Sequence, residues 1–378
     1  MSGEKSSKVK NIVRKYRLYP NKEQETYFAK CFGCVRFVYN HMLWEKQEYY
    51  KETGKNIRIT PAKYKKEFPW LKEVDSLALA NAQLHLETAY KNFFRNPDAG
   101  FPKFKSKHGS RESYTTNVVN GNIYLEGTYL RLPKVGKVKL RIHRNVEEGC
   151  RLKSVTISKE ATGKYYAALL YQCACIENQV HEDKIENVLG VDFAMHGMAV
   201  FSDGTKADYP MYYRQAEKKL AREQRKLSKC QKGSCNYQKQ KVRLARAHEK
   251  IRNQRSDFQH KLSHRLSEEY DVIAVESLNM KGMSHALKFG KSTMDNGYGR
   301  FLNQLAYKME RNGKKLIKID RFYPSSKRCS CCGKIKTDQK LSDRVYRCSC
   351  GNIMDRDLNA AINIRDEAIR ILGIGVSQ

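Results

Sequence analysis

Three acidic residues at the ends of apolar segments constrain the fold of this chain more than any other feature of its sequence. Asp192 lies near the end of the apolar run VLGVDF, and Glu276 ends the run VIAVE. Asp357 and its neighbour Asp355 begin a helix-like segment, DRDLNAAINI. A carboxylate is costly to bury unless hydrogen bonds or a cation compensate for it. A buried ion pair explains one such acid, but three acids in the order strand, strand, helix favour one shared site.

Carboxylates gathered in one place repel one another and raise one another's pKa unless cations hold them. Mg²⁺ is the natural cation, because it is hard and prefers oxygen ligands. Two such ions, about 3.5–4 Å apart, can activate a water and stabilise the leaving oxygen in phosphodiester cleavage. A strand hairpin over residues 187–204, a later strand over 270–280 and a C-terminal helix would carry the three acids. That arrangement predicts an RNase H-like core.

The charge of the chain is strongly positive. Its 378 residues include 72 Lys and Arg residues against 40 Asp and Glu residues, which gives a formal net charge of +32. An excess of this size predicts a polyanionic partner, and nucleic acid is the leading candidate. A membrane surface is the alternative, but we find no long apolar run, lipidation signal or basic amphipathic tail. The basic N-terminus has no apolar signal core after it, so we expect a cytoplasmic protein.

Positive charge is concentrated in residues 213–266, which carry 17 Lys and Arg residues against four acidic residues. Leu244, Ile251 and Phe258 recur every seven residues there, a spacing that predicts amphipathic helices rather than a disordered tail. A run of charge is usually only a solvated helix face. The density and length of this run favour a surface that neutralises the phosphates of a nucleic acid.

The apolar pattern changes its period along the chain. Residues 10–20 predict a strand, Asn21 and Gln24 predict a capping box, and helical spacing then continues to about residue 95. Residues 114–175 instead alternate in short runs separated by Gly, Asn and Pro, which predicts a small antiparallel barrel or sheet. The early strand can pair with that sheet, which would make the helices an insertion.

Four of the twelve cysteines form two closely spaced pairs. Cys329 and Cys332 form a CxxC pair, Cys348 and Cys350 form a CxC pair, and a glycine follows each pair. The 15 residues between the pairs suit a zinc ribbon, so we predict one structural Zn²⁺ held by four thiolates. The short second pair leaves Cys331 as an alternative to Cys332. A zinc ribbon that contacts nucleic acid is the alternative role.

We interpret the remaining cysteines as thiols, because a reducing cytoplasm disfavours disulfides. These cysteines show no metal-ligand pattern: Cys31, Cys34, Cys150, Cys173, Cys175, Cys230 and Cys235. His196, in the turn after Asp192, could approach the shared site, but it is more often a plain turn residue.

The sequence resembles the TnpB family, compact RNA-guided DNA nucleases encoded by insertion sequences and related to type V CRISPR effectors. The resemblance runs nearly end to end. Its segments are KYRLYPNKEQ, FGCVRFVYN, NFFRN followed by GFPKFKSK, GVDF, IAVESLNMKGM, DRFYPSSKRCSCCG and DRDLNAAINI. It implies a RuvC-type Asp-Glu-Asp site at Asp192, Glu276 and Asp357. The family's catalytic acid lies two residues before the Asn of the DxNAA stretch, which matches Asp357 and leaves Asp355 as a helix cap.

The resemblance also implies an α+β multidomain organisation. An antiparallel β-barrel (the wedge domain) would contain an inserted helical recognition domain, and an RNase H-like (RuvC) α/β domain with an inserted zinc ribbon would follow. The expected boundaries are 1–20 for the first wedge strand, 21–105 for the recognition helices, 106–178 for the wedge barrel, 187–327 for the RuvC-like domain with basic helices 213–266, 328–351 for the zinc ribbon, and 352–378 for the C-terminal helix and tail.

The implied function is that of an RNA-guided DNA endonuclease of a transposable element, acting on the nucleoid of a prokaryotic cytoplasm. The implied partners are a transposon-derived guide RNA and double-stranded target DNA next to a short motif; no membrane is expected, and a monomer is favoured. Tyr39, Trp70, Tyr90 and Phe93 are candidates to stack on bases, although core packing is the commoner role. The alternatives are a guided regulator without cleavage, a CRISPR-associated effector of the same lineage, and a transposase proper. The intact set of three acids favours the nuclease.

Overall fold

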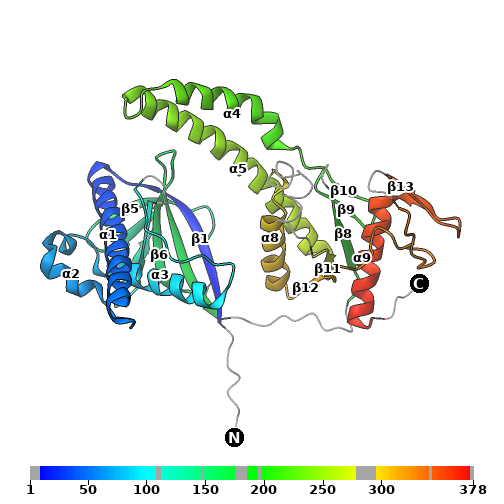
Figure 1. The fold of residues 1–378 in the computed structure, drawn as a ribbon, viewed down its shortest axis with the longest axis horizontal. Coiled ribbons are helices and arrows are strands. Elements are labelled where there is room, and N and C mark those ends of the chain that lie inside the picture. The colour runs from blue at the N-terminus through cyan, green and yellow to red at the C-terminus, as the bar shows by residue number, and fades with distance from the viewer. Residues whose placement is uncertain are drawn as a thin grey trace, which may run out of the picture. The chain divides into compact units, whose positions relative to one another are not determined.

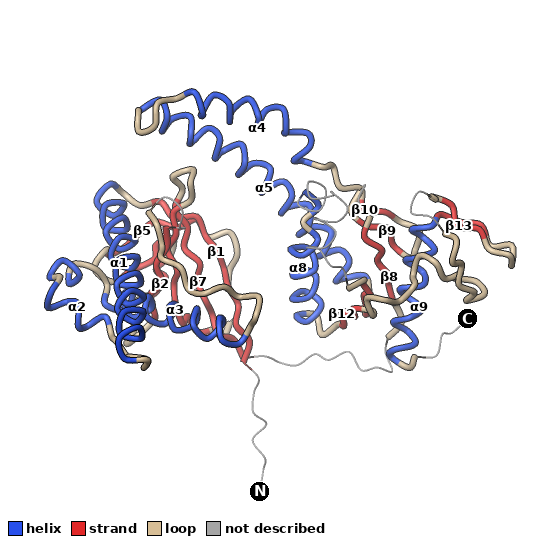
Figure 2. The backbone as a smooth tube through the Cα atoms, viewed as in Figure 1, coloured by secondary structure: helices blue, strands red, loops and turns tan. Residues whose placement is uncertain are grey.

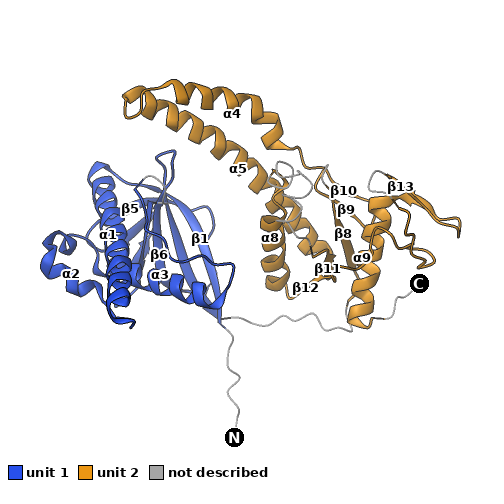
Figure 3. Ribbon diagram, in the orientation of Figure 1, with its two compact units in different colours: residues 1–176 blue, residues 177–378 orange. Residues whose placement is uncertain are grey.

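The computed structural model describes residues 9–107, 112–146, 148–174, 185–194, 197–277, 295–339 and 343–374. The chain divides into two compact units, Met1–Ile176 and Glu177–Gln378, coloured separately in Figure 3. Residues 175–184, between the expected wedge barrel and the expected RuvC-like domain, and also His196 lie outside the described residues. A search of the described helices finds none whose length and apolar character would let it cross a membrane.

Unit 1 is built on an antiparallel sheet with the strand order β2-β6-β7-β1-β5-β4-β3 (Figures 1 and 2). The strands are β1 (Val9–Tyr19), β2 (Glu112–Asn117), β3 (Tyr124–Glu126), β4 (Tyr129–Leu132), β5 (Gly136–Arg141), β6 (Arg151–Lys159) and β7 (Tyr165–Ala174). The prediction that the first strand joins the later sheet is confirmed, because β1 lies between β5 and β7. Among the described strands the edge strands β2 and β3 do not pair with each other, so these strands form an open antiparallel sheet, the second of the two forms that the alternation predicts.

The helices of unit 1 are inserted between β1 and β2, as predicted. They are α1 (Lys22–Thr53), α2 (Pro61–Glu67), the 3₁₀ helix η1 (Pro69–Lys72) and α3 (Ser76–Arg95). The capping box is confirmed: the Asn21 side chain accepts a hydrogen bond from the Gln24 N–H at 2.8 Å, and the Gln24 side chain accepts one from the Asn21 N–H at 3.1 Å. Phe28 of α1 packs against Tyr114 and Tyr165 of the sheet, so helices and sheet share one core.

One expectation about the cysteines is wrong. Cys150 and Cys173 form a disulfide bond in the structure, although we expected thiols. The β6–β7 ladder explains the contact, because Arg151 pairs with Gln172 and the next residues outward are the two cysteines. Cys31 and Cys34 are free and buried within α1, as expected.

Unit 2 contains a mixed sheet with the strand order β10-β9-β8-β11-β12. The strands are β8 (Val188–Phe193), β9 (Ala199–Phe201), β10 (Lys206–Ala207), β11 (Val272–Val275) and β12 (Lys315–Lys318). The strand hairpin predicted at 187–204 is confirmed as β8 and β9. Strands β8, β11 and β12 run parallel, so their carboxyl ends meet at one edge of the sheet.

The helices of unit 2 are α4 (Tyr212–Lys229), α5 (Cys235–Glu269), α8 (Tyr298–Arg311) and α9 (Arg356–Leu372). Helices α5 and α8 cover one face of the sheet and α9 the other, whereas α4 runs away from it (Figure 1). Ile273 and Val275 of β11 share a core with α5 and α8, whereas Ala274 packs with α9 on the opposite face. Helices α4 and α5 pack against each other as the basic hairpin, which contains the predicted segment 213–266.

Helix α9 lies directly on β8 at Gly190. A Cβ atom built at Gly190 would lie 2.0 Å from the Ala361 carbonyl oxygen and 2.6 Å from the Arg365 nitrogen. Backbone therefore meets backbone here, which only a glycine permits.

Candidate active site and cysteine cluster

The three predicted acids come from three elements of unit 2 that meet at one edge of its sheet. Asp192 is the penultimate residue of β8, Glu276 directly follows β11, and Asp357 lies in the first turn of α9. Val191 pairs with Val275 across the parallel ladder, so the residues that follow them, Asp192 and Glu276, are cross-strand neighbours. The structure thus places the three acids on two strands and a helix, β8, β11 and α9, in the order inferred from the sequence.

The environment of Asp192 shows that the three acids interact. Desolvation raises the pKa of Asp192 well above its usual value, and a side-chain hydrogen bond with Glu276 and the charges of Glu276 and Asp357 raise this pKa further. The positive charge of Arg356 opposes this shift. Two carboxylates that share a hydrogen bond need a proton between them unless a cation takes its place. The site therefore contains negative charge that its protein surroundings only partly neutralise.

This raised pKa predicts how the stability of the metal-free protein depends on pH. Above about pH 4, the ordinary pKa of Asp, the folded chain binds more protons than the unfolded chain, so the free energy of unfolding falls as pH rises through the folded-state pKa. We expect Asp192→Asn to remove this decline and to raise the melting temperature at neutral pH, by about 2–4 °C for each kcal/mol gained. Thermal melts from pH 5 to 8 without added Mg²⁺ check this, and equal slopes in both proteins would contradict it.

Asp357 is held by two arginines. Its Oδ1 lies 3.1 Å from Arg356 Nη2, and its Oδ2 lies 3.9 Å from Arg344 Nη1. Within the described part of the chain, the three acids are not a set whose carboxylate oxygens all lie within 4.8 Å of one another. The arrangement is an open one, in which Asp357 contacts guanidinium groups while Asp192 and Glu276 contact each other.

The neighbouring acid, Asp355, has a different role. Its side chain accepts hydrogen bonds from the backbone N–H groups of Asp357 at 2.8 Å and Leu358 at 3.2 Å, so it is the N-cap of α9. Burial opposes ionisation of Asp355, but these hydrogen bonds and the charge of Lys206 outweigh burial and hold its pKa below the usual value. The predicted cap is confirmed.

A buried polar group at the start of α8 was not among the predicted site residues. The Tyr298 hydroxyl donates a hydrogen bond to the carbonyl oxygen of Ala194, and the Asn296 side-chain amide donates to the same oxygen at 3.4 Å. The Tyr298 ring packs against Phe193 with 5.0 Å between ring centroids. Because Ala194 is two residues beyond Asp192, these contacts fix the backbone that carries the acid.

Asp295 extends this group to the basic hairpin. Its carboxylate accepts hydrogen bonds from the Tyr209 hydroxyl at 2.9 Å and from the backbone N–H groups of Tyr213 at 3.1 Å and Arg214 at 3.3 Å. A carboxylate at the first turn of α4 compensates the unpaired N–H groups there. Residues 295–298 thus join the base of the basic hairpin to the strand end that carries Asp192. The sequence signal was only a polar pair, DN, before an aromatic helix face.

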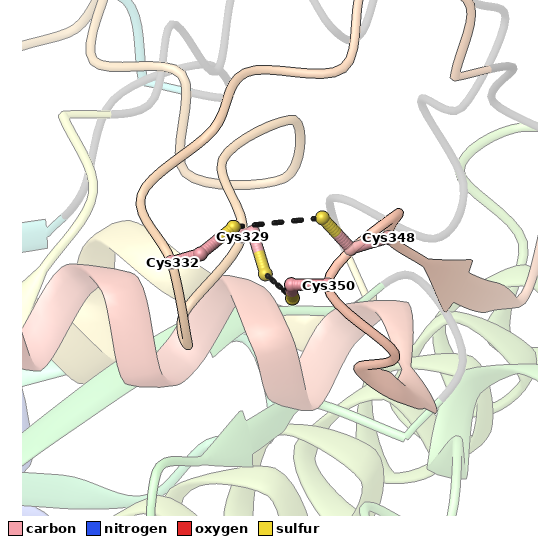
Figure 4. Close-up of side chains that lie close together, drawn as sticks. All are labelled: Cys329, Cys332, Cys348 and Cys350. Atoms are coloured by element: carbon pink, nitrogen blue, oxygen red, sulfur yellow. Dashed lines mark hydrogen bonds between the residues drawn. The ribbon is translucent and has the colours of Figure 1, made fainter.

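The four predicted cysteines, Cys329, Cys332, Cys348 and Cys350, converge, as Figure 4 shows. Their sulfur atoms all lie within 4.8 Å of one another, with 3.7 Å between Cys329 and Cys350 and 3.6 Å between Cys332 and Cys348. Cys331 is exposed and lies outside this group. The structure therefore favours Cys332 over Cys331 as the second member of the first pair.

Each cysteine pair forms a tight turn that ends in glycine. The Gly333 N–H donates to the Cys329 carbonyl at 2.9 Å, and the Gly351 N–H donates to the Cys348 carbonyl at 3.1 Å. Both glycines have positive φ, +72° and +93°, which favours glycine.

The first turn also stabilises a thiolate. Burial opposes ionisation of Cys329, but hydrogen bonds from the Cys332 backbone, the Asn352 side chain and the Cys331 backbone lower its pKa to about 6. Zn²⁺ binds deprotonated cysteine, commonly in sets of four. The cluster is consistent with a zinc-binding site.

The cysteine cluster is attached to α9 at both ends. Its second pair lies between β13 (Val345–Arg347) and β14 (Ile353–Asp355), and β14 leads straight into the helix. On the other side, the buried Asn359 accepts a hydrogen bond from the Ser330 N–H at 3.0 Å and donates to the Arg328 carbonyl at 2.7 Å. Asn363 donates to the same carbonyl at 2.6 Å. The helix that carries Asp357 is therefore held by the cysteine turns.

Comparisons with family models cover much of the chain. Residues 171–287 match OrfB_IS605, described as a probable transposase, and residues 298–364 match a Cas12f1-like TNB domain. Residues 10–55 match a model described as a helix-turn-helix domain, HTH_OrfB_IS605. In the structure this last segment consists of β1 and the single long helix α1, so the description does not fit its local fold.

Two curated relatives align with nearly the whole chain. The "Putative RNA-guided DNA endonuclease" of Streptomyces pristinaespiralis is 33% identical over 362 residues, which cover 93% of this chain and 87% of the relative. The "Putative RNA-guided DNA endonuclease InsQ" of Escherichia coli K12 is 31% identical over 386 residues, which cover 96% and 93%.

A solved structure, the Cas12f1-sgRNA-target DNA complex, contains a chain that is 13% identical, with a TM-score of 0.59 over 94% of this chain and 99% of that one. This similarity places the protein in the Cas12f1-like fold class. On the sequence evidence, the chain belongs to the TnpB family.

Proposed function

We propose that the protein is an RNA-guided DNA endonuclease of a transposable element, in which Asp192, Glu276 and Asp357 are the catalytic acids. One observation carries the proposal: three acids far apart in sequence interact at one sheet edge of a protein with a net charge of +32. A structural ion pair would explain Asp357 and its arginines. It does not explain why Asp192 and Glu276 share a hydrogen bond at the cost of a raised pKa.

The residues present fit Mg²⁺. Three carboxylates supply the hard oxygen ligands that this ion prefers, and the raised pKa of Asp192 marks negative charge that cations, two in this proposal, would neutralise. When bound, Mg²⁺ would activate a water and stabilise the leaving oxygen in hydrolysis of a phosphodiester. The chain's own part is to hold the three acids on β8, β11 and α9 and to place Arg356 beside Asp357, where its charge offsets part of theirs.

The basic hairpin is the proposed route by which nucleic acid is attracted to this site. Lys and Arg side chains along α4 and α5 would neutralise phosphates and make binding depend on salt. We found no sequence-reading motif in the chain, which fits delegation of specificity to a guide RNA, with the protein reading only a short motif beside the target. Unit 1 would supply the wedge and recognition domains, and unit 2 the RuvC-like domain with its zinc ribbon. We expect a monomer to form this complex.

We also propose that the four clustered cysteines hold one structural Zn²⁺. All four positions are occupied by protein sulfur, as in closed structural sites. The ion would secure the turns that hold α9, so its effect on cleavage would be indirect.

The test is cleavage of a plasmid by the protein co-expressed with its flanking non-coding RNA. The plasmid carries a site matched to the guide beside a randomised motif, in buffer with Mg²⁺. We expect double-strand breaks that require the matched guide and that reveal the motif. If the wild type and Asp192→Ala both bind the matched target equally well and neither cuts it, the protein is a guided regulator and the proposed nuclease activity is wrong.

Tyr298 gives a finer prediction about how the site is held. We expect Tyr298→Phe to lower the cleavage rate by about 5-fold, because it removes the hydrogen bond to Ala194, worth about 1 kcal/mol, while the ring still packs. Guide RNA affinity should change little, and the melting temperature should fall by about 2–4 °C. Tyr307→Phe is the matched control, since Tyr307 lies exposed on the same helix. Equal rates for both variants would show that the Ala194 contact does not position Asp192.

A further inference from the structure

Unit 1 contains a groove along α1 with a volume of about 420 Å³. Gly33, Phe37, Asn40 and Trp44 line it from the helix, and Phe104 lines it from the segment that follows α3. Residues three and four apart in a helix lie on one face, so these four form a single stripe of α1. A hollow of this size is within the range of pockets that hold small organic molecules.

The groove is bordered by large aromatic rings that remain in contact with solvent. Trp44 is 51% exposed and Phe104 is 53% exposed. His41 packs against Trp44 with 5.6 Å between ring centroids, and Phe37 stacks on His41 at 5.3 Å and packs edge-on against Trp70 at 4.9 Å. The groove therefore presents flat apolar surfaces, and contacts with other rings support Trp44.

Two hydrogen bonds hold the wall of the groove in place. The Asn40 side-chain amide donates to the Lys105 carbonyl at 2.9 Å, and the Lys105 N–H donates to the Asn40 side-chain oxygen at 2.8 Å. The ammonium group of Lys105 lies 3.9 Å from the centre of the Tyr39 ring. Phe104, next to Lys105, is thus fixed against α1, and the groove is formed before any ligand arrives.

Gly33 lies in the interior of α1, where glycine is less stable than alanine. Its backbone conformation does not require glycine, because Gly33 is not among the residues with positive φ. Packing does not require glycine either, because a Cβ atom built there meets no other atom within 4 Å. The fold itself gains nothing from this glycine, so the space above it is available to a molecule that the chain does not supply.

We propose that this groove binds an unpaired nucleotide of the guide RNA, whose base stacks on Trp44 and Phe104 above Gly33. Aromatic side chains with nearby cations are the usual platform for unpaired bases, and here Arg36 lines the groove while the exposed Lys103 precedes Phe104. The inference rests on the proposed function and names the RNA as occupant. Target DNA is double-stranded until the guide opens it, whereas the guide RNA presents single-stranded nucleotides from the start.

Substitution of Gly33 separates this proposal from a purely structural role. We expect Gly33→Ala to stabilise α1 and to raise the melting temperature of the full-length protein, yet to weaken its binding to guide RNA. Gly33→Leu should weaken that binding more, because its side chain fills the groove. If Gly33 were only structural, stability would change and RNA affinity would not.

The aromatic border gives the second arm of the test. We expect Trp44→Ala and Phe104→Ala each to weaken guide RNA binding about 5-fold or more, and Trp44→Phe to retain most of the affinity. Tyr50→Ala is the matched control, because Tyr50 is 62% exposed on the same helix but does not line the groove. Affinity is measured by fluorescence anisotropy with labelled guide RNA, without target DNA, at one fixed salt concentration.

The possible failures have different meanings. If the wild-type protein does not bind its flanking RNA, the proposed function fails. If it binds and the Gly33, Trp44 and Phe104 variants bind equally well, the groove has no role in holding RNA and this inference is wrong. If RNA affinity is unchanged and only the affinity of the RNA–protein complex for target DNA falls, the occupant is DNA, which also overturns the assignment made here.

Discussion

Asp192→Asn is expected to lower the rate of guide-dependent cleavage by at least about 10³-fold, equivalent to about 4 kcal/mol of transition-state stabilisation. Asparagine has nearly the same shape as aspartate and keeps a hydrogen-bonding group beside Glu276, but it cannot supply the negative oxygen ligand. Binding of guide RNA and of matched target DNA should be unchanged, because the substitution leaves the basic surface intact. Single-turnover cleavage and binding measurements on the same complexes check both the lower cleavage rate and the unchanged binding.

The two acids of the DRD segment provide the control. Asp357→Asn should lose cleavage as Asp192→Asn does. Asp355→Asn should keep it, because asparagine caps a helix as well as aspartate does, and Asp355 serves α9 as its N-cap. The reverse pattern, with Asp355→Asn inactive and Asp357→Asn active, would show that the third catalytic acid has been assigned to the wrong residue.

Cys332→Ser is expected to abolish binding of the proposed Zn²⁺ and to lower cleavage about 100-fold or more, with a much smaller effect on guide RNA affinity. Structural zinc contributes about 10–16 kcal/mol of apparent binding free energy in small zinc domains, so its loss should disorder both cysteine turns. Asn359 and Asn363 would then lose the carbonyl and N–H groups that they bind, and β14 would no longer fix the start of α9. Metal content by mass spectrometry, measured beside cleavage rates, checks the prediction.

Cys331→Ser is the matched control for this experiment. Cys331 is exposed and adjacent to Cys332 in sequence, yet it lies outside the cluster, so this variant should retain both zinc and cleavage. Zinc loss in Cys331→Ser would mean that the ligand set includes Cys331. Full cleavage by a zinc-free Cys332→Ser protein would show that α9 is held without the metal.

Features encoded by short stretches of sequence were predicted best. The capping box at Asn21 and Gln24 and the cap at Asp355 depend on side chains within three residues of the helix start. The cysteine pairs have ligand spacing and turn glycines that a few residues determine. The three acids could be found because each ends or begins an apolar segment. An acid at such a place is unusual, because burying a carboxylate is costly unless it is compensated.

Features that depend on distant contacts were missed. The Cys150–Cys173 bond follows from the register of β6 and β7, which includes an irregularity between Leu152 and Ser154. A one-residue change of register would separate these cysteines, and alternation in the sequence does not fix it. The contact of Tyr298 with Ala194 likewise joins elements about a hundred residues apart. No local pattern reveals such a contact before the fold is known.

Gly190 has a consequence for the chemistry of the whole site. It lies two residues before Asp192 on β8, and Ala361, whose carbonyl would collide with any side chain there, lies one helical turn after Asp357. The distance between Asp192 and Asp357 therefore depends on direct contact between the backbones of β8 and α9, which is the closest packing that a strand and a helix can reach. Any larger residue at position 190 would push α9 away from β8 and would move Asp357 away from Asp192. The absence of a Cβ atom at Gly190 thus sets the spacing of the acids in this site.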